Sequence, residues 1–233
     1  MRRSAGALAA ALLAVLIVTA PAGAQAQYPT KPIRLVVPFA PGGSSSIIAR
    51  AFSTEMSKGL GQQFVIENKP GGGGNIAMED VAKADPDGYT LIIGHIGTFA
   101  VNPFMFAKLP FDTNRDFRAV SLFSKVPQIY VVPSGVPAKD LREFIALAKK
   151  EPGKLNYGSA GNGSAGHLAG EMFKAQAGVF MVHIPYAGGN PAQLALLSGQ
   201  VDLNFDNLAA ASANIKAGKL RALAVTTAKR SSA

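Results

Sequence analysis

The 233-residue sequence contains no cysteine. Disulfide bonds, thiol chemistry and a lipid-modified N-terminal cysteine are therefore excluded. Tryptophan is also absent, and aromatic residues make up only 8% of the chain, which leaves few rings on which nucleobases could stack. These absences argue against thiol-based chemistry and against binding of nucleic acid.

Acidic residues are scarce, with 14 Asp and Glu against 23 Lys and Arg and a formal net charge of +9. The basic residues are scattered, and only Lys149-Lys150 and Lys229-Arg230 are adjacent. A nucleic-acid surface needs clustered basic residues. A scattered positive charge instead favours small anions through long-range attraction.

The N-terminus has the pattern of a secretory signal peptide. Arg2 and Arg3 precede an uncharged run over residues 5–20, and Ala24-Gln25-Ala26 has the small residues of a cleavage site. The run is short for a bilayer span, so a retained anchor is the less favoured alternative. We expect export by the general secretory route, with twin-arginine export as the less favoured alternative, and cleavage near Ala26. Removing residues 1–26 leaves 21 basic and 14 acidic residues, a net charge of +7.

Apolar periodicity predicts a βαβαβ unit in the first half of the mature chain. The expected strands are residues 33–39, 64–67 and 89–94, with Gly59 as the stop of the first helix and Asn75 as the cap of the second.

The second half is expected to repeat this architecture. Its predicted strands are residues 120–122, 129–132, 155–160, 179–184, 201–205 and 220–225. Pro137 is expected to open one helix, and Gly178 to end the next. Asn190 as cap, Pro191 as first residue and Gly199 as stop are expected to bracket a third, and Gly218 to close a fourth.

Two strands run into loops of small residues that open helices. One loop is Ala40-Pro41-Gly42-Gly43-Ser44-Ser45-Ser46, and the other is Gly161-Asn162-Gly163-Ser164. The unpaired N–H groups at a helix start favour anions, and ligands of open α/β sheets bind beyond the carboxyl ends of strands. We therefore expect one anionic ligand to be held from two sides in a cleft between the halves.

Eight motifs occur in order along the mature chain: residues 28–43, 67–71, 86–91, 155–164, 167–171, 185–188, 199–202 and 218–226. Together they resemble the extracytoplasmic solute receptors of tripartite tricarboxylate transporters, also called the Bug family. The resemblance extends from Tyr28 to about Ser231. Each motif alone is modest, and their common order makes the resemblance specific.

The resemblance implies a two-lobed α/β periplasmic binding protein of the Venus flytrap type, with a mainly parallel sheet in each lobe. It implies a receptor, not an enzyme, which delivers a small carboxylate to a membrane permease and is expected to be a monomer. The expected organisation is a signal peptide over residues 1–26, lobe 1 over 27–125, lobe 2 over 126–222 and a return segment to lobe 1 over 223–233. Hinges are expected near residues 124–128 and 221–225.

The resemblance also implies the ligand-binding residues, and no cofactor or metal. On one lobe they are Pro41, Gly42, Gly43 and Ser44. On the other they are Gly161, Asn162, Gly163 and Ser164, with contributions from Thr98, Gly188 and Asp206.

Two departures from the family pattern matter. Relatives commonly carry an acidic residue in the first loop, where this chain has Ser46 and Ile47, so an amino-acid ligand is less favoured. Members also continue well beyond residue 226, whereas this sequence stops at Ala233. We expect a fragment or a truncated first lobe, which in the latter case would expose apolar surface.

Alternative interpretations stay open for several features. Gly42 and Gly43 could simply relieve a tight turn, Gly71 to Gly74 favour a flexible connection, and Asp206 could cap the next helix instead of binding ligand. The three histidines lie far apart without a metal-ligand spacing.

Two other functions compete with that of a transport receptor. An exported hydrolase or phosphate-handling enzyme lacks support, because neither Ser159 nor Ser164 has nucleophile-elbow spacing and no phosphate loop ends in Lys-Ser/Thr. A periplasmic sensor arm that signals to a membrane histidine kinase is not separable from a transport receptor by sequence.

Overall fold

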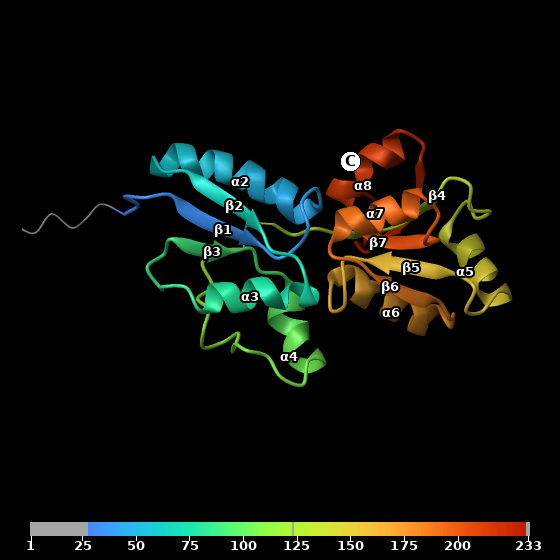
Figure 1. Ribbon diagram of the computed structural model, residues 1–233. Helices are drawn as coiled ribbons and strands as arrows, with labels where there is room; N and C mark the ends of the chain where they lie inside the picture. The colour runs from blue at the N-terminus through green and yellow to red at the C-terminus, as the bar shows by residue number, and fades with distance from the viewer. Residues whose placement is uncertain (1–27, 123, 232–233) are drawn as a thin grey trace, which may run out of the picture. The chain divides into compact units, whose positions relative to one another are not determined.

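A three-stranded parallel sheet with the order β2-β1-β3 forms the first half of the computed structural model (Figure 1). The structure describes residues 28–122 and 124–231, so the predicted signal peptide lies outside the described residues. Strands β1 (Ile33–Val37), β2 (Phe64–Asn68) and β3 (Thr90–Ile92) confirm the predicted βαβαβ unit. Its nearly continuous apolar sequence suits β1 to this central, covered position.

Helices α2 (Ser44–Leu60) and α3 (Asn75–Ala82) cover opposite faces of this sheet (Figure 1). Leu35 and Val37 of β1 pack with Ala49 of α2 and with Ile93 in a buried cluster. Three short elements complete this part of the chain: the single turn η1 (Gly72–Gly74), the π-helical η2 (Gly97–Val101) and α4 (Asn102–Met105). We call β1 to α4 the first lobe.

The second lobe, β4 to β8, contains a five-stranded sheet with the order β6-β5-β7-β4-β8. Its strands are β4 (Gln128–Pro133), β5 (Asn156–Ser159), β6 (Val182–Pro185), β7 (Leu203–Asn207) and β8 (Leu220–Val225). Strand β4 pairs antiparallel with both β7 and β8, whereas β5 pairs in parallel with β6 and β7. The second half therefore does not repeat the first, because one strand is reversed.

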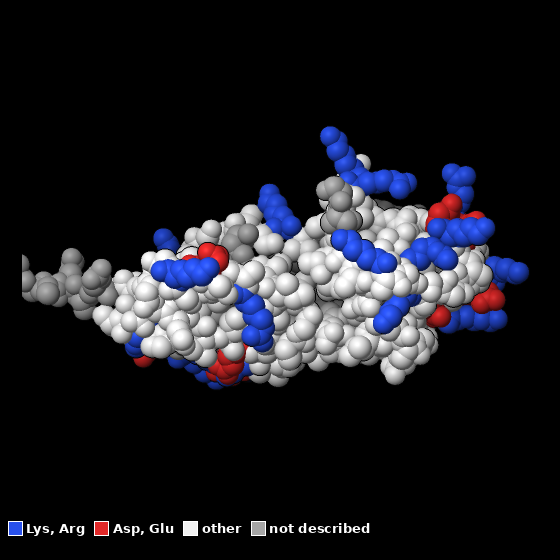
Figure 2. Space-filling view, turned by 90° about the horizontal axis from the view of Figure 1, so that it is seen from above, with Lys and Arg blue, Asp and Glu red and all other residues white. Residues whose placement is uncertain are grey.

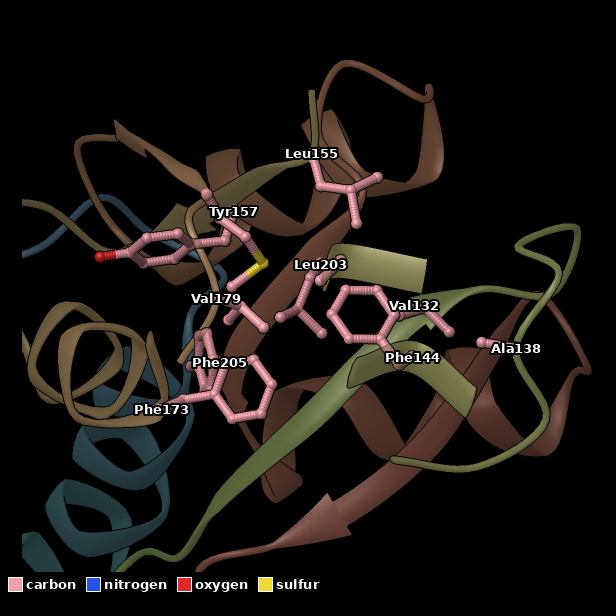
Figure 3. Packing of buried hydrophobic residues seen from close by; sticks show 11 residues of the cluster. Val132, Ala138, Phe144, Leu155, Tyr157, Phe173, Val179, Leu203 and Phe205 are labelled. Atoms are coloured by element: carbon pink, nitrogen blue, oxygen red, sulfur yellow. The ribbon is translucent and has the colours of Figure 1, made fainter. Parts of the chain in front are cut away.

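Four helices pack on the two faces of this sheet: α5 (Leu141–Lys150), α6 (Ala165–Ala177), α7 (Gly189–Leu197) and α8 (Leu208–Lys216). Phe144 of α5 and Phe173 of α6 meet Phe205 of β7 in one buried cluster, where Figure 3 shows their rings. On the other face, Leu196 of α7 and Ala211 of α8 form a second cluster with β4 and β8. Alternation along the strands divides the core between these faces.

Several predicted boundaries are wrong, and each has a local cause. Helix α2 continues past Gly59, and Gly61 follows its last turn. Asp140, whose side chain accepts a hydrogen bond from the Glu143 N–H at 2.8 Å, starts α5 in place of Pro137. Gly188 precedes α7, so Asn190 and Pro191 lie inside its first turn, whereas Gly199, with φ of +75°, follows the end of the helix as predicted.

Two further predictions fail because they depend on distant partners. Asn75 is not a cap but the first residue of α3, and its side chain accepts a hydrogen bond from Asn102 at 2.7 Å. Residues 120–122 form no strand; Val120 and Leu122 are 81% and 74% exposed. An apolar triplet becomes a strand only where another strand pairs with it.

Residues 223–225, which we expected to return to the first lobe, complete β8 and pair with β4. The predicted hinge over residues 221–225 is therefore wrong, because that segment is hydrogen-bonded along a strand of the second sheet. Residues 124–127 carry no regular structure between the lobes, and the first hinge stays a prediction, as do the remaining domain boundaries.

Charged side chains are scattered over the surface in Figure 2, with acidic groups between the basic ones. An ion-pair group lies on the first lobe: Arg34 contacts Glu67 at 2.6 Å and Asp80 at 2.5 Å, and Lys69 contacts Asp80 at 2.8 Å. It links β1, β2 and α3. No helix in residues 28–122 and 124–231 combines the length and apolar character needed to cross a bilayer.

Candidate functional site

The first small-residue loop, residues 40–44 (loop 1), joins β1 to α2. Gly42 has φ of +87°, a conformation that side-chain-bearing residues rarely adopt. Gly43 precedes the helix, and its carbonyl accepts hydrogen bonds from the N–H groups of Ser46 and Ile47. Ser44 is buried, and its Oγ accepts a hydrogen bond from Asn207 of the second lobe.

Loop 1 lies against the start of α7. The Ala40 N–H donates to the Ala187 carbonyl at 3.0 Å. Gly188 approaches the same backbone so closely that an added Cβ would lie 3.0 Å from the Ala40 nitrogen. Residues 31–233 form one compact unit, and within it the two lobes touch here. The structure thus brings predicted residues of loop 1 and Gly188 together.

The second loop, residues 161–164 (loop 2), joins β5 to α6. The Ser164 hydroxyl accepts a hydrogen bond from the His167 N–H at 3.2 Å and caps α6. The N–H groups of Gly161 and Gly163 donate to Ser159 Oγ and His167 Nδ1 at 3.1 Å. These donors are therefore already used within the lobe. Asn162 is exposed, and its side chain has no hydrogen-bond partner in the described part of the chain.

A cavity of about 320 Å³ lies beside loop 2. Its walls are the glycine turn (residues 71–74), Phe106, residues 160–162 and residues 185–187. No lining residue carries a formal charge. Loop 1 does not line this cavity; it contacts the wall from behind at Ala187. Of the predicted binding residues, Gly161 and Asn162 lie in the wall itself.

The glycine turn is a wall component that the sequence did not predict, since we favoured a flexible connection there. It forms the single turn η1 directly before α3. Tyr186 and Ala187 were also missed as lining residues, although residues 185–188 formed one of the family motifs. The signal that could have identified both segments is their position after β2 and β6, at the carboxyl ends of parallel strands.

Thr98 lies behind the wall and not in it. It is fully buried, its Oγ1 donates to the His95 carbonyl at 3.2 Å, and its methyl group packs against Gly74. A Cβ at Gly74 would lie 2.6 Å from that methyl carbon. Thr98 therefore supports the glycine turn by packing.

Asp206 is buried on the α7 face of β7, away from the cavity lining. Its carboxylate accepts hydrogen bonds from Gln193 Nε2 at 3.1 Å and from the Asn207 N–H at 2.7 Å. Burial raises its pKa to about 6 despite these two bonds. The side chain of Asp206 caps no helix: it forms no bond into α8, and the cap residue is Asn207.

We expect Asp206→Asn to raise the free energy of unfolding relative to the wild type, and to raise it more at pH 8 than at pH 4. A raised carboxyl pKa means that the folded state holds its proton longer, so the contribution of Asp206 to the free energy of unfolding falls as the pH rises from about 4 through 6, opposite in sign to the contribution of the buried histidines. The variant lacks this loss, and its advantage at pH 8 is expected to be about 3 kcal/mol. Thermal melts of both proteins at pH 4 and pH 8 measure it. If the stability gain of the variant is larger at pH 4 than at pH 8, the pKa of Asp206 is not raised in the folded state.

Two histidines that are distant in sequence lie together beneath loop 2. The rings of His167 and His183 stack with centroids 4.3 Å apart, and His183 stacks on Tyr157. Burial lowers the pKa of both histidines, that of His183 to about 4. Helix α6, which carries His167, also places Glu171 and Lys174 near the pair. Sequence spacing did not predict this pairing.

The His183 Nε2 atom is also 2.7 Å from Ser159 Oγ, so a serine and a histidine do meet here. Ser159 is 1% exposed, and its Oγ donates to the Gly161 carbonyl and accepts from the Gly161 N–H. A nucleophile must reach its substrate, whereas this hydroxyl is enclosed and holds loop 2. In the described residues no group of three metal-ligating side chains occurs.

A family model described as "Tripartite tricarboxylate transporter family receptor" matches residues 48–233. A curated protein from Pseudomonas sp. strain P51, named for the tcbD-tcbE intergenic region, is 40% identical over 203 residues, or 87% of this chain. The chain spans only 60% of that relative, less than two thirds of its length.

Solved structures agree with this match. R. palustris Rpa4515 with adipate is 41% identical with a TM-score of 0.85, and the match covers 87% of this chain and 68% of that one. The periplasmic binding protein BugD is 37% identical with a TM-score of 0.83 and the same coverage. MatC from Rhodopseudomonas palustris with bound malate is 36% identical with a TM-score of 0.82, covering 87% and 69%.

Proposed function

Because this chain belongs to the tripartite tricarboxylate transporter receptor family, we propose that it binds a small carboxylate in the cavity beside loop 2. This family consists of solute receptors and not of enzymes, and the solved neighbours are periplasmic binding proteins. In our proposal, the chain works in the periplasm and delivers its ligand to a membrane permease.

The observation that carries the proposal is the uncharged cavity between the glycine turn and loop 2. Both walls follow parallel strands, and α6 begins directly behind loop 2. A carboxylate there would meet the positive end of a 13-residue helix without a fixed countercharge. The free amide of Asn162 and the peptide groups of the glycine turn supply neutral hydrogen-bond donors.

The size of the cavity fits a ligand of a few carbon atoms. Relatives solved with adipate and malate bind acids of this size. Phe106 and Tyr186 supply apolar surface for the carbon chain. The proposal therefore selects an aliphatic carboxylate with up to about six carbons, and the scattered positive charge assists its capture.

Titration calorimetry with adipate and malate tests the proposal. We expect Asn162→Ala to weaken the bound acid about tenfold, since one hydrogen bond to a charged group is lost. We expect Gly43→Val to weaken binding of the acid by displacing the start of α7. A Cβ at Gly43 already lies 3.6 Å from the Gly189 and Asn190 nitrogens, so the larger valine would press on them.

Gly135→Ala is the matched control. It lies between β4 and α5 with nothing within 4 Å of an added Cβ, so its affinity should equal that of the wild type. Unchanged affinity in both Asn162→Ala and Gly43→Val, with secondary structure intact, would place the ligand elsewhere.

A further inference from the structure

Asn102 lies in the first lobe at the start of α4, with no exposed surface. Its Nδ2 donates to the Gly73 carbonyl at 3.0 Å and to Asn75 Oδ1 at 2.7 Å. Gly73 belongs to the glycine turn, and Asn75 is the first residue of α3. The side-chain amide therefore holds the cavity wall from behind, and the Gly73 carbonyl, which can only accept, fixes which end of the amide is nitrogen.

The other end of the same amide points across the lobe boundary. Asn102 Oδ1 is buried and has no hydrogen-bond partner among the described residues. A Cβ placed on Gly163 of loop 2 would lie 2.5 Å from this oxygen. The oxygen therefore touches the bare Cα of Gly163, and any larger residue there would displace one of the two.

Backbone contacts on either side show that this approach is close. A Cβ at Gly73 would lie 2.7 Å from the Asn162 carbonyl oxygen, and one at Gly97 would lie 2.5 Å from the Gly163 carbonyl oxygen. The two walls of the cavity thus meet edge to edge beside Asn102. Real Cβ contacts are longer than 3.0 Å, so only glycine permits this separation.

We propose that Asn102 is the positioning residue of the cavity, because one amide both holds the glycine turn through Nδ2 and stops loop 2 at Gly163 through Oδ1. The separation of the two walls, and with it the length of acid that fits, is set by this side chain. The inference rests on the proposed function for the identity of the ligand but not for the contact between the lobes.

The contact predicts a coupling that a purely structural asparagine would lack. Gly163→Ala should weaken adipate binding at least tenfold, because its Cβ would lie 2.5 Å from Oδ1 and would push loop 2 away from the glycine turn. Asn102→Ala should weaken binding about tenfold by releasing the glycine turn. In the double variant the obstruction is gone, so the loss should stay near tenfold and not reach a hundredfold.

Alanine at Gly163, where φ is +75°, strains the backbone equally in the free and the ligand-bound protein. This strain therefore does not change the binding affinity. Gly135→Ala should bind as the wild type does. The ratio of the adipate and malate affinities should also move toward one in Asn102→Ala, because a loosened wall no longer selects acids by length. The proposal is overturned if the affinity losses of the two single variants multiply in the double variant and the adipate-to-malate affinity ratio stays unchanged.

A second arm needs no ligand. The absence of cysteine allows a single disulfide between Ala40→Cys and Ala187→Cys, whose backbones share a hydrogen bond, to hold the lobes together. In this oxidised chain, Gly163→Ala should lower the melting temperature more than in the reduced chain, and adding Asn102→Ala should remove that difference.

If Gly163→Ala lowers the melting temperature equally in the oxidised and reduced chains, the contact between Asn102 and Gly163 is contradicted. Two free thiols that persist under oxidant contradict the contact between the lobes. If neither adipate nor malate binds the wild type, the proposed ligand class fails, while the melts of the oxidised chain still decide the role of Asn102.

Discussion

Gly166→Ala is expected to lower the melting temperature by about 6–12 °C, as a loss of about 3 kcal/mol does in a chain of this size. Gly166 lies in the first turn of α6, where an added Cβ would overlap the backbone carbonyl of Phe205 in β7. A backbone oxygen in a paired strand cannot move aside. Helix α6 would therefore have to rise from the sheet.

The same displacement should remove ligand binding. Loop 2 immediately precedes α6, and its bonds to Ser159 and His167 anchor it to both the strand and the helix. Lifting the helix pulls these anchors apart. We therefore expect a loss of affinity much larger than the tenfold effect of Asn162→Ala.

Gly59→Ala is the matched control, because Gly59 also lies in a helix but an added Cβ there meets nothing within 4 Å. Alanine is the better helix former, so we expect this variant to be more stable by about 0.5–1 kcal/mol. Calorimetric melts and adipate titrations of both variants provide the comparison. A melting temperature of Gly166→Ala within 1 °C of the wild type would show that α6 lies farther from β7.

Stability is expected to fall steeply as the pH is lowered from 6.5 to 4. Burial lowers the pKa of His95 and of His183 from 6.5 to about 4, and lowers that of His167. Between pH 4 and 6.5 the unfolded state therefore binds more protons than the folded state, so stability is full above pH 6.5 and is lost toward pH 4. His95 alone accounts for about 3 kcal/mol.

Geometry explains why these rings resist protonation. His95 Nδ1 accepts a hydrogen bond from the Gly97 N–H at 3.0 Å, and its buried Nε2 has no partner in the described residues. His167 Nδ1 accepts from Gly163. A proton on either Nδ1 would place two donors face to face. The Asp206 contribution has the opposite sign and offsets part of the loss.

Melts of wild type and His95→Phe between pH 4 and pH 8 test this expectation. Phenylalanine keeps a ring beside Phe39, which lies 4.6 Å from the His95 centroid, but it cannot take up a proton. The variant should show a shallower acid loss than the wild type. Parallel curves for the two proteins would show that the histidine does not control acid stability.

Local sequence signals predicted much of the scaffold. The apolar run of β1, the small residues before α2 and α6, and Gly178 after α6 act within a few residues, so their outcome does not depend on distant contacts. The ordered motifs also predicted the receptor family, which the family match confirmed.

The sites of contact between distant segments were not predictable in this way. Residues 71–74 and 160–162 are nearly ninety positions apart, and nothing in either segment specifies that they face each other across one cavity. The same is true of His167 beside His183, and of β8 beside β4. Such pairings depend on how sheets and helices pack, which local periodicity does not encode.

The sequence by itself determined that two glycine-containing loops would open helices after buried strands, and that their chemistry would suit an anion. Tertiary structure decided that loop 2 lies in the cavity wall, that loop 1 contacts this wall from behind, and that the glycine turn faces loop 2. The physical reason is steric: only segments without a Cβ can approach so closely, and Asn102 limits that approach from the opposite lobe.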